Sequence, residues 1–202
     1  MKKRVWSFAL LLCMVLTLLP GTALAADVVA FGTCGESVTW TLDSDGVLTV
    51  SGTGTMEKPD GDVFWGYDYP DLQKVCIEDG ITGIGNNAFK TCPMTTVEIP
   101  ESVTSIGSHA FAGCSRLQRV VLPDGIPAIP DNAFFACFKL TSIVIPDSVT
   151  SIGNSAFSNC ISLVSIPVPD GVTSIGEGAF SGCDGLRSMT FPEGVSEIRA
   201  YT

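Results

Sequence analysis

The sequence predicts a solenoid whose stacked coils form a parallel β-sheet on one side, with short extended pieces and single helical turns on the other. An Ala-Phe pair recurs with its Phe at positions 89, 111, 134, 157 and 180, and a Cys follows each Phe by three residues. Whole stretches also return, since "IPDSVTSIGNSAFSNC" from Ile145 closely matches "IPESVTSIGSHAFAGC" from Ile99. Steps of 22 and 23 residues indicate a supersecondary unit that buries its apolar face only by stacking on its neighbours.

Each repeat begins with a strand. In "LTSIVIP" apolar and other side chains alternate, which is the period of a strand with one buried face. The expected inward positions are Leu140, Ile143 and Ile145, and the expected outward positions are Ser142 and Val144.

The rest of the repeat returns the chain to the next strand. Pro146 ends the strand, and Asp147 with Ser148 favours a turn. Residues 149–152 form a second extended piece, and residues 154–160 suit one helical turn that faces the core with its Ala, Phe and Cys. Coils stacked at about 4.8 Å would align equivalent side chains in columns.

Residues 1–25 are interpreted as a signal peptide. Lys2, Lys3 and Arg4 precede an apolar run over residues 5–19, and Ala23-Leu24-Ala25 has the small-x-small pattern of a cleavage site before Ala26. A membrane anchor is the rival interpretation, but the run is short and ends in a Pro-Gly pair. The sequence therefore predicts a secreted or cell-surface protein.

The net charge of the chain disfavours some classes of binding partner. Removing three basic residues with the leader leaves 8 Lys and Arg against 21 Asp and Glu, a formal charge of 8 − 21 = −13. Such a charge repels nucleic acid and anionic membranes. We therefore expect a monomer with no nucleic-acid partner and no membrane insertion after cleavage.

An N-terminal β-rich cap is expected over residues 26–70. Residues 37–42 and 47–51 alternate apolar and hydroxyl side chains around the turn Asp43-Ser44-Asp45-Gly46, which predicts a β-hairpin. That turn superficially resembles a calcium loop, but its Gly comes two places early. Four rings are expected to cover the first coil, those of Phe64, Trp65, Tyr67 and Tyr69.

The repeats are expected over residues 71–202, as five complete copies and a truncated sixth. The sixth copy begins at Phe191 and reaches Thr202 just before the position of its core Phe. A solenoid needs a polar cap on its last coil, so we expect the natural chain to continue.

The repeat pattern L-x-x-V-x-I-P-x-x-V-T-x-I-G-x-x-A-F-x-x-C, from about Leu72 onward, resembles the BspA-type leucine-rich repeat of bacterial secreted and cell-surface proteins. The stretch "CGESVTWTLDSDGVLTVSGTGTM" from Cys34 resembles the amino-terminal segment often found in these proteins. The resemblance implies a leucine-rich repeat solenoid. It also implies adhesion to host or neighbouring-cell macromolecules, proteins foremost.

No catalytic constellation is evident. His109 is the one histidine, and it occupies a variable repeat position that holds Asn87, Asn132, Ser155 and Gly178 in the other copies. A Ser-His-Asp or Cys-His site would need partners that the pattern does not supply. We expect neither an enzyme nor a cofactor.

The cysteines are expected to be mostly buried thiols. Seven remain after leader removal, and five share one repeat position, at 92, 114, 137, 160 and 183. Parallel side chains would keep their Cβ atoms about 4.8 Å apart, beyond the usual 3.5–4.5 Å or so of a disulfide. Cys76 differs because it occupies an outward strand position, and a bridge between Cys34 and Cys76 stays open as an alternative.

A column of carboxylates follows the Pro position of each repeat. Repulsion between neighbours in water is under about 1 kcal/mol and is screened by salt, so turn chemistry alone could tolerate it. A bound cation is the alternative, and no metal ligands are assigned. The column comprises Asp79, Glu101, Asp124, Asp147, Asp170 and Glu193.

The outward strand positions are the expected binding surface, because they form a small, mostly uncharged face on an acidic protein and solenoids commonly bind partners on such faces. The competing hypothesis is a structural spacer for a downstream domain. The residues expected to bind an extracellular protein or other cell-surface macromolecule are Arg119, Val121, Ser142, Val144 and Ser165.

Overall fold

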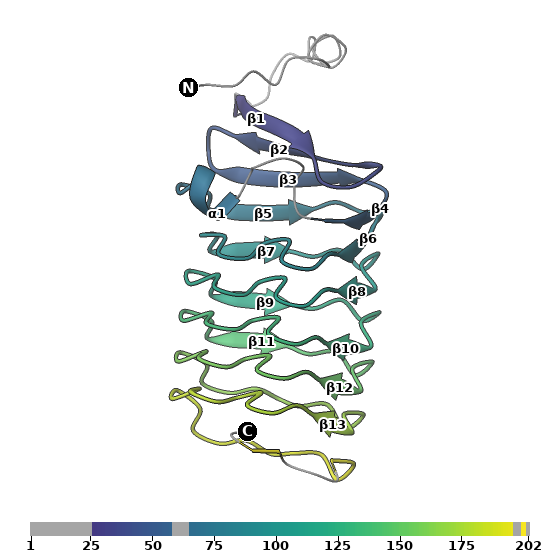
Figure 1. Cartoon of the computed structure of the whole chain (residues 1–202), viewed down its shortest axis with the longest axis vertical. Helices are drawn as coiled ribbons and strands as arrows, with labels where there is room; N and C mark the ends of the chain where they lie inside the picture. The colour runs from purple at the N-terminus through teal and green to yellow at the C-terminus, as the bar shows by residue number, and fades with distance from the viewer. Residues whose placement is uncertain (1–25, 58–64, 196–198, 201–202) are drawn as a thin grey trace, which may run out of the picture.

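The computed structural model describes residues 26–57, 65–195 and 199–200, and the predicted signal peptide lies outside them. The described chain winds into a stack of similar coils, with antiparallel strands at its N-terminal end (Figure 1). This arrangement confirms the expected solenoid. No helix in the described residues has the length and apolar character of a membrane span.

The main sheet has seven strands in the order β1-β2-β3-β5-β7-β9-β11. The first three pair antiparallel and the others pair parallel, one strand for each coil. The register aligns Arg119 with Ser142 and Val121 with Val144, so equivalent side chains form columns. The strands are β1 (Val28–Thr33), β2 (Val38–Asp43), β3 (Val47–Gly52), β5 (Lys74–Ile77), β7 (Thr96–Glu98), β9 (Arg119–Val121) and β11 (Ser142–Val144).

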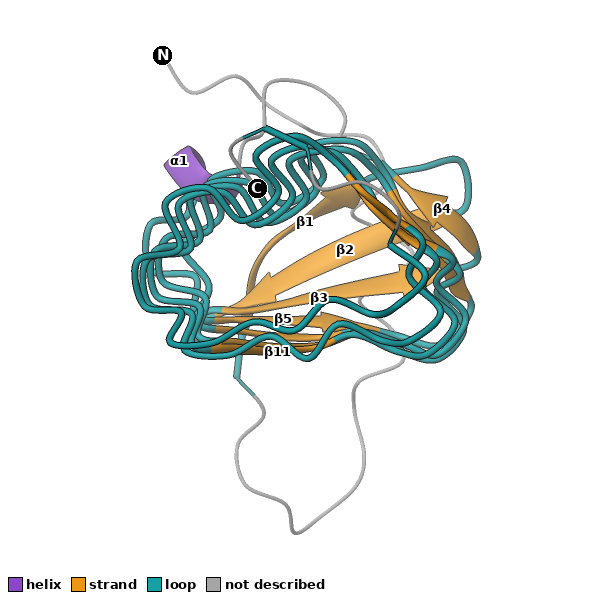
Figure 2. Cartoon of the chain, turned by 90° about the horizontal axis from the view of Figure 1, so that it is seen from below, coloured by secondary structure: helices purple, strands orange, loops and turns teal. Residues whose placement is uncertain are grey.

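Two three-stranded parallel sheets form a second side of the stack. Viewed along the stack, the coils superpose as closed loops with strands on these two sides (Figure 2). One sheet contains β4 (Gly54–Met56), β6 (Ile81–Ile84) and β8 (Ser105–Ile106); the other contains β10 (Ala128–Ile129), β12 (Ser151–Ile152) and β13 (Ser174–Ile175). The strands β6, β8, β10, β12 and β13 are the second extended pieces that the repeat pattern predicts, whereas β4 belongs to the cap and was not predicted.

The segment predicted as a single helical turn has a different structure. Ser155, Phe157 and Asn159 donate their N–H groups to carbonyls of the next coil, over N–O distances of 2.7–2.9 Å. The intervening N–H groups donate to carbonyls three residues back, and Ser155 and Asn159 have φ values of 51° and 61°. A helix would use its N–H groups internally, whereas this alternation frees every second one to join the coils. We call this arrangement the turn ladder.

Two positions in each turn ladder adopt the left-handed conformation, which Asn and Gly tolerate best. The first position holds Asn87, His109, Asn132, Ser155 and Gly178, with φ of 51–60°. The second holds Thr91, Gly113, Ala136, Asn159 and Gly182, with φ of 56–73°. His109 therefore occupies a position at which the turn ladder requires a positive φ.

Ala136→Gly is expected to stabilise the protein by about 0.5–1 kcal/mol, because the left-handed strain that is removed exceeds the added entropy of the unfolded chain. Urea unfolding of the variant and the wild type measures the change. Gly113→Ala, at the same position of the preceding coil, is the reciprocal control and should destabilise by a similar amount. A destabilising Ala136→Gly would contradict the assignment of strain.

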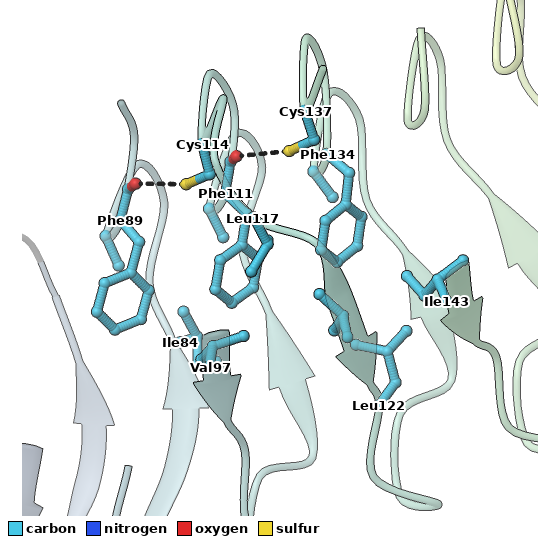
Figure 3. Close-up of a cluster of buried hydrophobic side chains, with 14 of the residues drawn as sticks. Ile84, Phe89, Val97, Phe111, Cys114, Leu117, Leu122, Phe134, Cys137 and Ile143 are labelled. Carbon is cyan, nitrogen blue, oxygen red and sulfur yellow. Dashed lines mark hydrogen bonds between the residues drawn. The ribbon is translucent and has the colours of Figure 1, made fainter. Parts of the chain in front are cut away.

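The core contains a column of aromatic rings. Successive rings of Phe89, Phe111, Phe134, Phe157 and Phe180 stack with centroids 5.3–5.6 Å apart and interplanar angles of 1–14°. Figure 3 shows three of these rings above inward strand residues such as Val97 and Ile143. The column confirms that the Phe of each repeat faces inward.

Aromatic rings of the cap continue this column. Trp65, in α1 (Trp65–Asp68), stacks on Phe89 with centroids 5.2 Å apart, which confirms its predicted place over the first coil. Trp40 of β2 packs edge-on against Trp65 and Tyr69. Phe64 and the Tyr67 side chain lie outside the described residues.

The predicted hairpin is confirmed by the pairing of β2 with β3. Asp43 Oδ1 accepts the N–H groups of Asp45 and Val47 at 3.0 and 2.9 Å, so this carboxylate stabilises the turn. The sequence did not predict β1, which extends the hairpin into three antiparallel strands.

Candidate functional site

The strand face consists of the five predicted binding residues, Arg119, Val121, Ser142, Val144 and Ser165. The sheet brings four of them together, because β9 and β11 pair in register. Val120 and Ile143 point into the core, so their neighbours point outward. Val121 and Val144 are 49% and 46% exposed and lie side by side on this surface.

Ser165 is exposed at the equivalent position of the next coil, but the expected strand around it is absent from the described structure. Pro167 occupies the repeat position of Val144 and has no N–H to donate to a ladder. The main sheet therefore ends at β11. The coil still stacks there, since Val164 N–H donates to Thr141 O at 3.4 Å.

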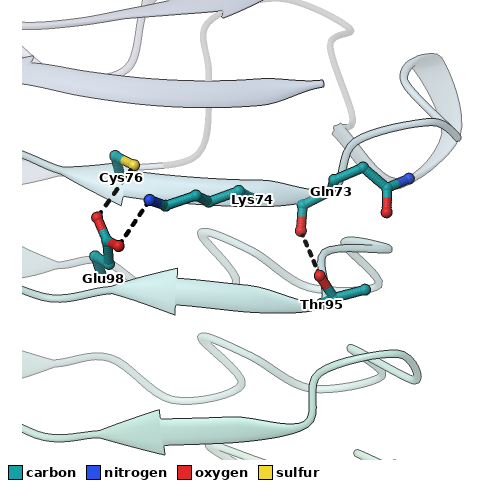
Figure 4. A network of polar contacts seen from close by, with 5 residues as sticks. All are labelled: Gln73, Lys74, Cys76, Thr95 and Glu98. Carbon is teal, nitrogen blue, oxygen red and sulfur yellow. Dashed lines mark hydrogen bonds and ion pairs between the residues drawn. The ribbon is translucent and has the colours of Figure 1, made fainter. Parts of the chain in front are cut away.

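A polar cluster joins β5 and β7 near the cap (Figure 4). Lys74 Nζ lies 2.7 Å from Glu98 Oε1, and Cys76 Sγ lies 3.4 Å from Glu98 Oε2. The hydrogen bonds from Lys74 and Cys76 lower the pKa of Glu98, and burial raises the pKa of Cys76. Cys76 is a free thiol, so the alternative bridge between Cys34 and Cys76 is not formed.

The five cysteines of the repeat column are buried free thiols, as predicted. Four of them donate an S–H hydrogen bond to the carbonyl oxygen of a Phe in the preceding coil, over 3.1–3.2 Å (Figure 3). Burial raises the pKa of Cys137 to about 12 and that of Cys183 to about 11. The column thiols are therefore structural, because a thiolate is the nucleophilic form.

In the native protein, Cys76 is expected to react with a disulfide reagent at pH 8 at least about 100-fold faster than the column thiols. The raised pKa of a column thiol such as Cys137 depletes its thiolate, and burial blocks the reagent. Timed release of thionitrobenzoate, with and without denaturant, measures both classes. Cys76→Ser should abolish the fast phase, and a fast phase that survives in this variant would refute the assignment.

The predicted carboxylate column is exposed along the turns that follow the strands. Glu101 Oε2 accepts the N–H of Asp124 at 3.1 Å, which links two of these turns. In the described part of the chain, no three His, Cys, Asp or Glu side chains gather as a metal site.

A group of exposed apolar side chains lies just before the strand positions and was not predicted from the sequence. Phe138, Ile161 and Val164 are 42%, 47% and 48% exposed. We call these three residues the pre-strand patch. A signal was present in the sequence, because other repeats have Ser115 and Asp184 at the position of Phe138 and Ile161.

Comparisons with known proteins agree with this architecture. The model of the BspA type leucine rich repeat region matches residues 71–202 in six copies. The chain is similar to a leucine-rich repeat protein of T. pallidum, with 33% identity over 77% of this chain and 69% of that chain and a TM-score of 0.56. No curated protein matches the chain.

Two further solved structures are longer than the matched region. A leucine-rich repeat protein from Bacteroides ovatus is 28% identical over 78% of this chain and 40% of that chain, with a TM-score of 0.59. A leucine rich cell surface protein from Faecalibacterium prausnitzii is 28% identical over 80% of this chain and 54% of that chain, with a TM-score of 0.47. The chain thus spans less than two thirds of either protein.

Proposed function

Since the chain belongs to the BspA-type leucine-rich repeat family, we propose that it is a secreted or cell-surface module that binds a macromolecular partner, a protein foremost, on its strand face. The observation that carries the proposal is the pair of exposed valines, Val121 and Val144, held in register on a parallel sheet. A rigid apolar pair loses little conformational entropy on binding and releases water when covered.

Two features support placing this module outside the cell. Residues 1–25 have the organisation of a secretory leader, and an acidic surface favours solubility there. Cleavage before Ala26 is expected, and amino-terminal sequencing of the exported protein measures it.

A scaffold role also agrees with the chemistry of the interior. The repeat family is built from stacked coils, and the thiols of the column have raised pKa values that suit packing rather than nucleophilic attack. We therefore propose a binding protein without catalytic activity.

Capture of extracellular-matrix and cell-surface proteins tests the proposal. Val121→Glu combined with Val144→Glu is expected to weaken capture by about tenfold or more, equivalent to about 1.4 kcal/mol, because it places two desolvated carboxylates in the contact. Ser105→Glu combined with Ser174→Glu adds the same charge to exposed positions of β8 and β13, and should leave capture unchanged.

Thermal unfolding of both double variants checks that the fold is intact. Equal capture by the wild type and the strand-face variant would exclude this face as the binding site. If the folded wild type captures nothing, the structural spacer becomes the better hypothesis.

A further inference from the structure

The pre-strand patch adjoins the strand face. Phe138 and Ile161 occupy the same position of successive coils, 23 residues apart. The hydrogen bond from Val164 N–H to Thr141 O keeps these coils in contact. Leu140 and Leu163 are fully buried in the same segments, which turns the patch residues toward solvent. Val164 is followed directly by exposed Ser165 of the strand face, so the two surfaces are continuous.

Charges are segregated about this surface. Residues 114–190 contain four basic residues. Each lies in the segment that runs from the column Cys of one coil to the last residue of the next strand or its repeat equivalent: Arg116, Arg119, Lys139 and Arg187. Of the six acidic residues in this stretch, all but Asp184 follow the strand position: Asp124, Asp131, Asp147, Asp170 and Glu177. The segments from each column Cys to the end of the next strand position therefore carry 4 − 1 = +3, and the segments that follow them carry −5.

The cations beside the patch are exposed. Within the described residues, the ion pair found is that of Lys74 with Glu98, so Arg116, Arg119 and Lys139 pair with no carboxylate. All three are exposed, and Arg116 and Lys139 share one position of adjacent coils. Their aliphatic stems can lie along apolar surface while their charged ends stay accessible.

This combination favours an extended polypeptide over other anions. Arg guanidinium groups bind carboxylates bidentately, and the exposed aromatic and aliphatic side chains need apolar partners. A nucleic acid or sulfated polysaccharide would satisfy the few cations, would leave the apolar side chains uncovered, and would be repelled by the acidic remainder of the molecule.

We infer that the binding surface extends from the strand face across the pre-strand patch, and that its partner is an extended polypeptide segment bearing both carboxylate and large apolar side chains. This inference rests on the proposed function and specifies the class of partner. The apolar side chains of the partner cover Phe138, Ile161 and Val164, while its carboxylates pair with Arg116, Arg119 and Lys139.

Selection from a random peptide display library on immobilised residues 26–202 tests the inference directly. Enriched peptides should combine Asp or Glu with Phe, Leu, Ile or Trp. For one such synthetic peptide, Arg116→Glu combined with Lys139→Glu should weaken binding by about tenfold or more. Phe138→Ser combined with Ile161→Ser should have a similar effect.

A reciprocal control makes a charge change of the same size and opposite sign, +4 in place of −4, on the post-strand side. Asp124→Lys combined with Asp147→Lys should not weaken binding of the acidic peptide. Enrichment of basic peptides, or unchanged affinity in both pre-strand variants, would overturn the inference. Heparin binding that Arg116→Glu combined with Lys139→Glu abolishes would assign the surface to a sulfated polysaccharide instead, and would also overturn it.

The two proposals can fail separately. If protein capture depends on Val121 and Val144 but is unaffected by both pre-strand variants, the strand face stands and the inference fails. If neither a protein nor a peptide binds the folded wild type, both proposals fail.

Discussion

Phe134→Ala is expected to lower the free energy of unfolding by about 3–5 kcal/mol. The ring is fully buried and stacks between Phe111 and Phe157, at centroid distances of 5.3 and 5.4 Å. Its removal leaves a cavity between two coils that each depend on their neighbours. The loss should therefore spread, and hydrogen exchange should accelerate in the adjacent coils as well as in the mutated one.

Phe135→Ala is the matched control, because it removes the same side chain one residue later, where the ring is 37% exposed. It should cost about 1 kcal/mol or less, since little packing is lost at a surface position. Urea unfolding followed by circular dichroism compares the two variants. Equal losses would mean that the aromatic column does not stabilise the stack.

Ser155→Pro is expected to destabilise the protein by about 3 kcal/mol or more. Ser155 has a φ of 51°, whereas the proline ring fixes φ near −65°. The substitution also removes the N–H that donates to Glu177 O at 2.9 Å, a bond of the turn ladder. The same unfolding experiment measures the loss.

Ser155→Gly separates these effects from the loss of the side chain. Gly178 adopts a φ of 60° at the equivalent position of the next coil, so glycine fits this backbone. This variant should be neutral or slightly stabilising. A Ser155→Pro protein as stable as Ser155→Gly would show that the turn ladder contributes little.

The periodic part of the fold could be predicted because stacked coils bury the same positions of each repeat, so the repeat period shows which side chains face the core. The alternation around Ile143 placed Ser142 and Val144 outside, and the recurrent Phe and Cys formed the buried columns. The hairpin was readable because its Asp-Gly turn separates two alternating segments.

The turn ladder was not foreseen because A-F-x-x-C has the three-residue spacing of a helix as well as that of successive turns. Asn and Gly at the positions of Asn132 and Gly178 were the available signal, since both residues tolerate positive φ. Strand β1 was not predicted because its apolar and polar residues do not alternate: the adjacent Val28 and Val29 are both apolar and both exposed.

The candidate site was predictable only in part. The sequence placed Val121 and Val144 on one face, but Pro167 removes the strand that was expected to carry Ser165. The ion pair of Lys74 with Glu98 joins two successive coils. It could not be predicted because the repeat between these coils is one residue shorter than the others, so the alignment of their side chains was not known from the sequence. The pre-strand patch consists of apolar residues at positions where other repeats have polar ones. A consensus of the repeats does not show such differences between single copies.

The turn ladder and the parallel sheets also determine how the molecule responds to force. Their hydrogen bonds join each coil to the next. The coils are stacked along the long axis of the molecule (Figure 1), so tension between its two ends pulls these bonds open one coil after another. Each coil adds about 4.8 Å to the folded length, but its 23 residues release roughly 80 Å of chain when peeled away. Under load the protein would lengthen in steps, as an extensible tether.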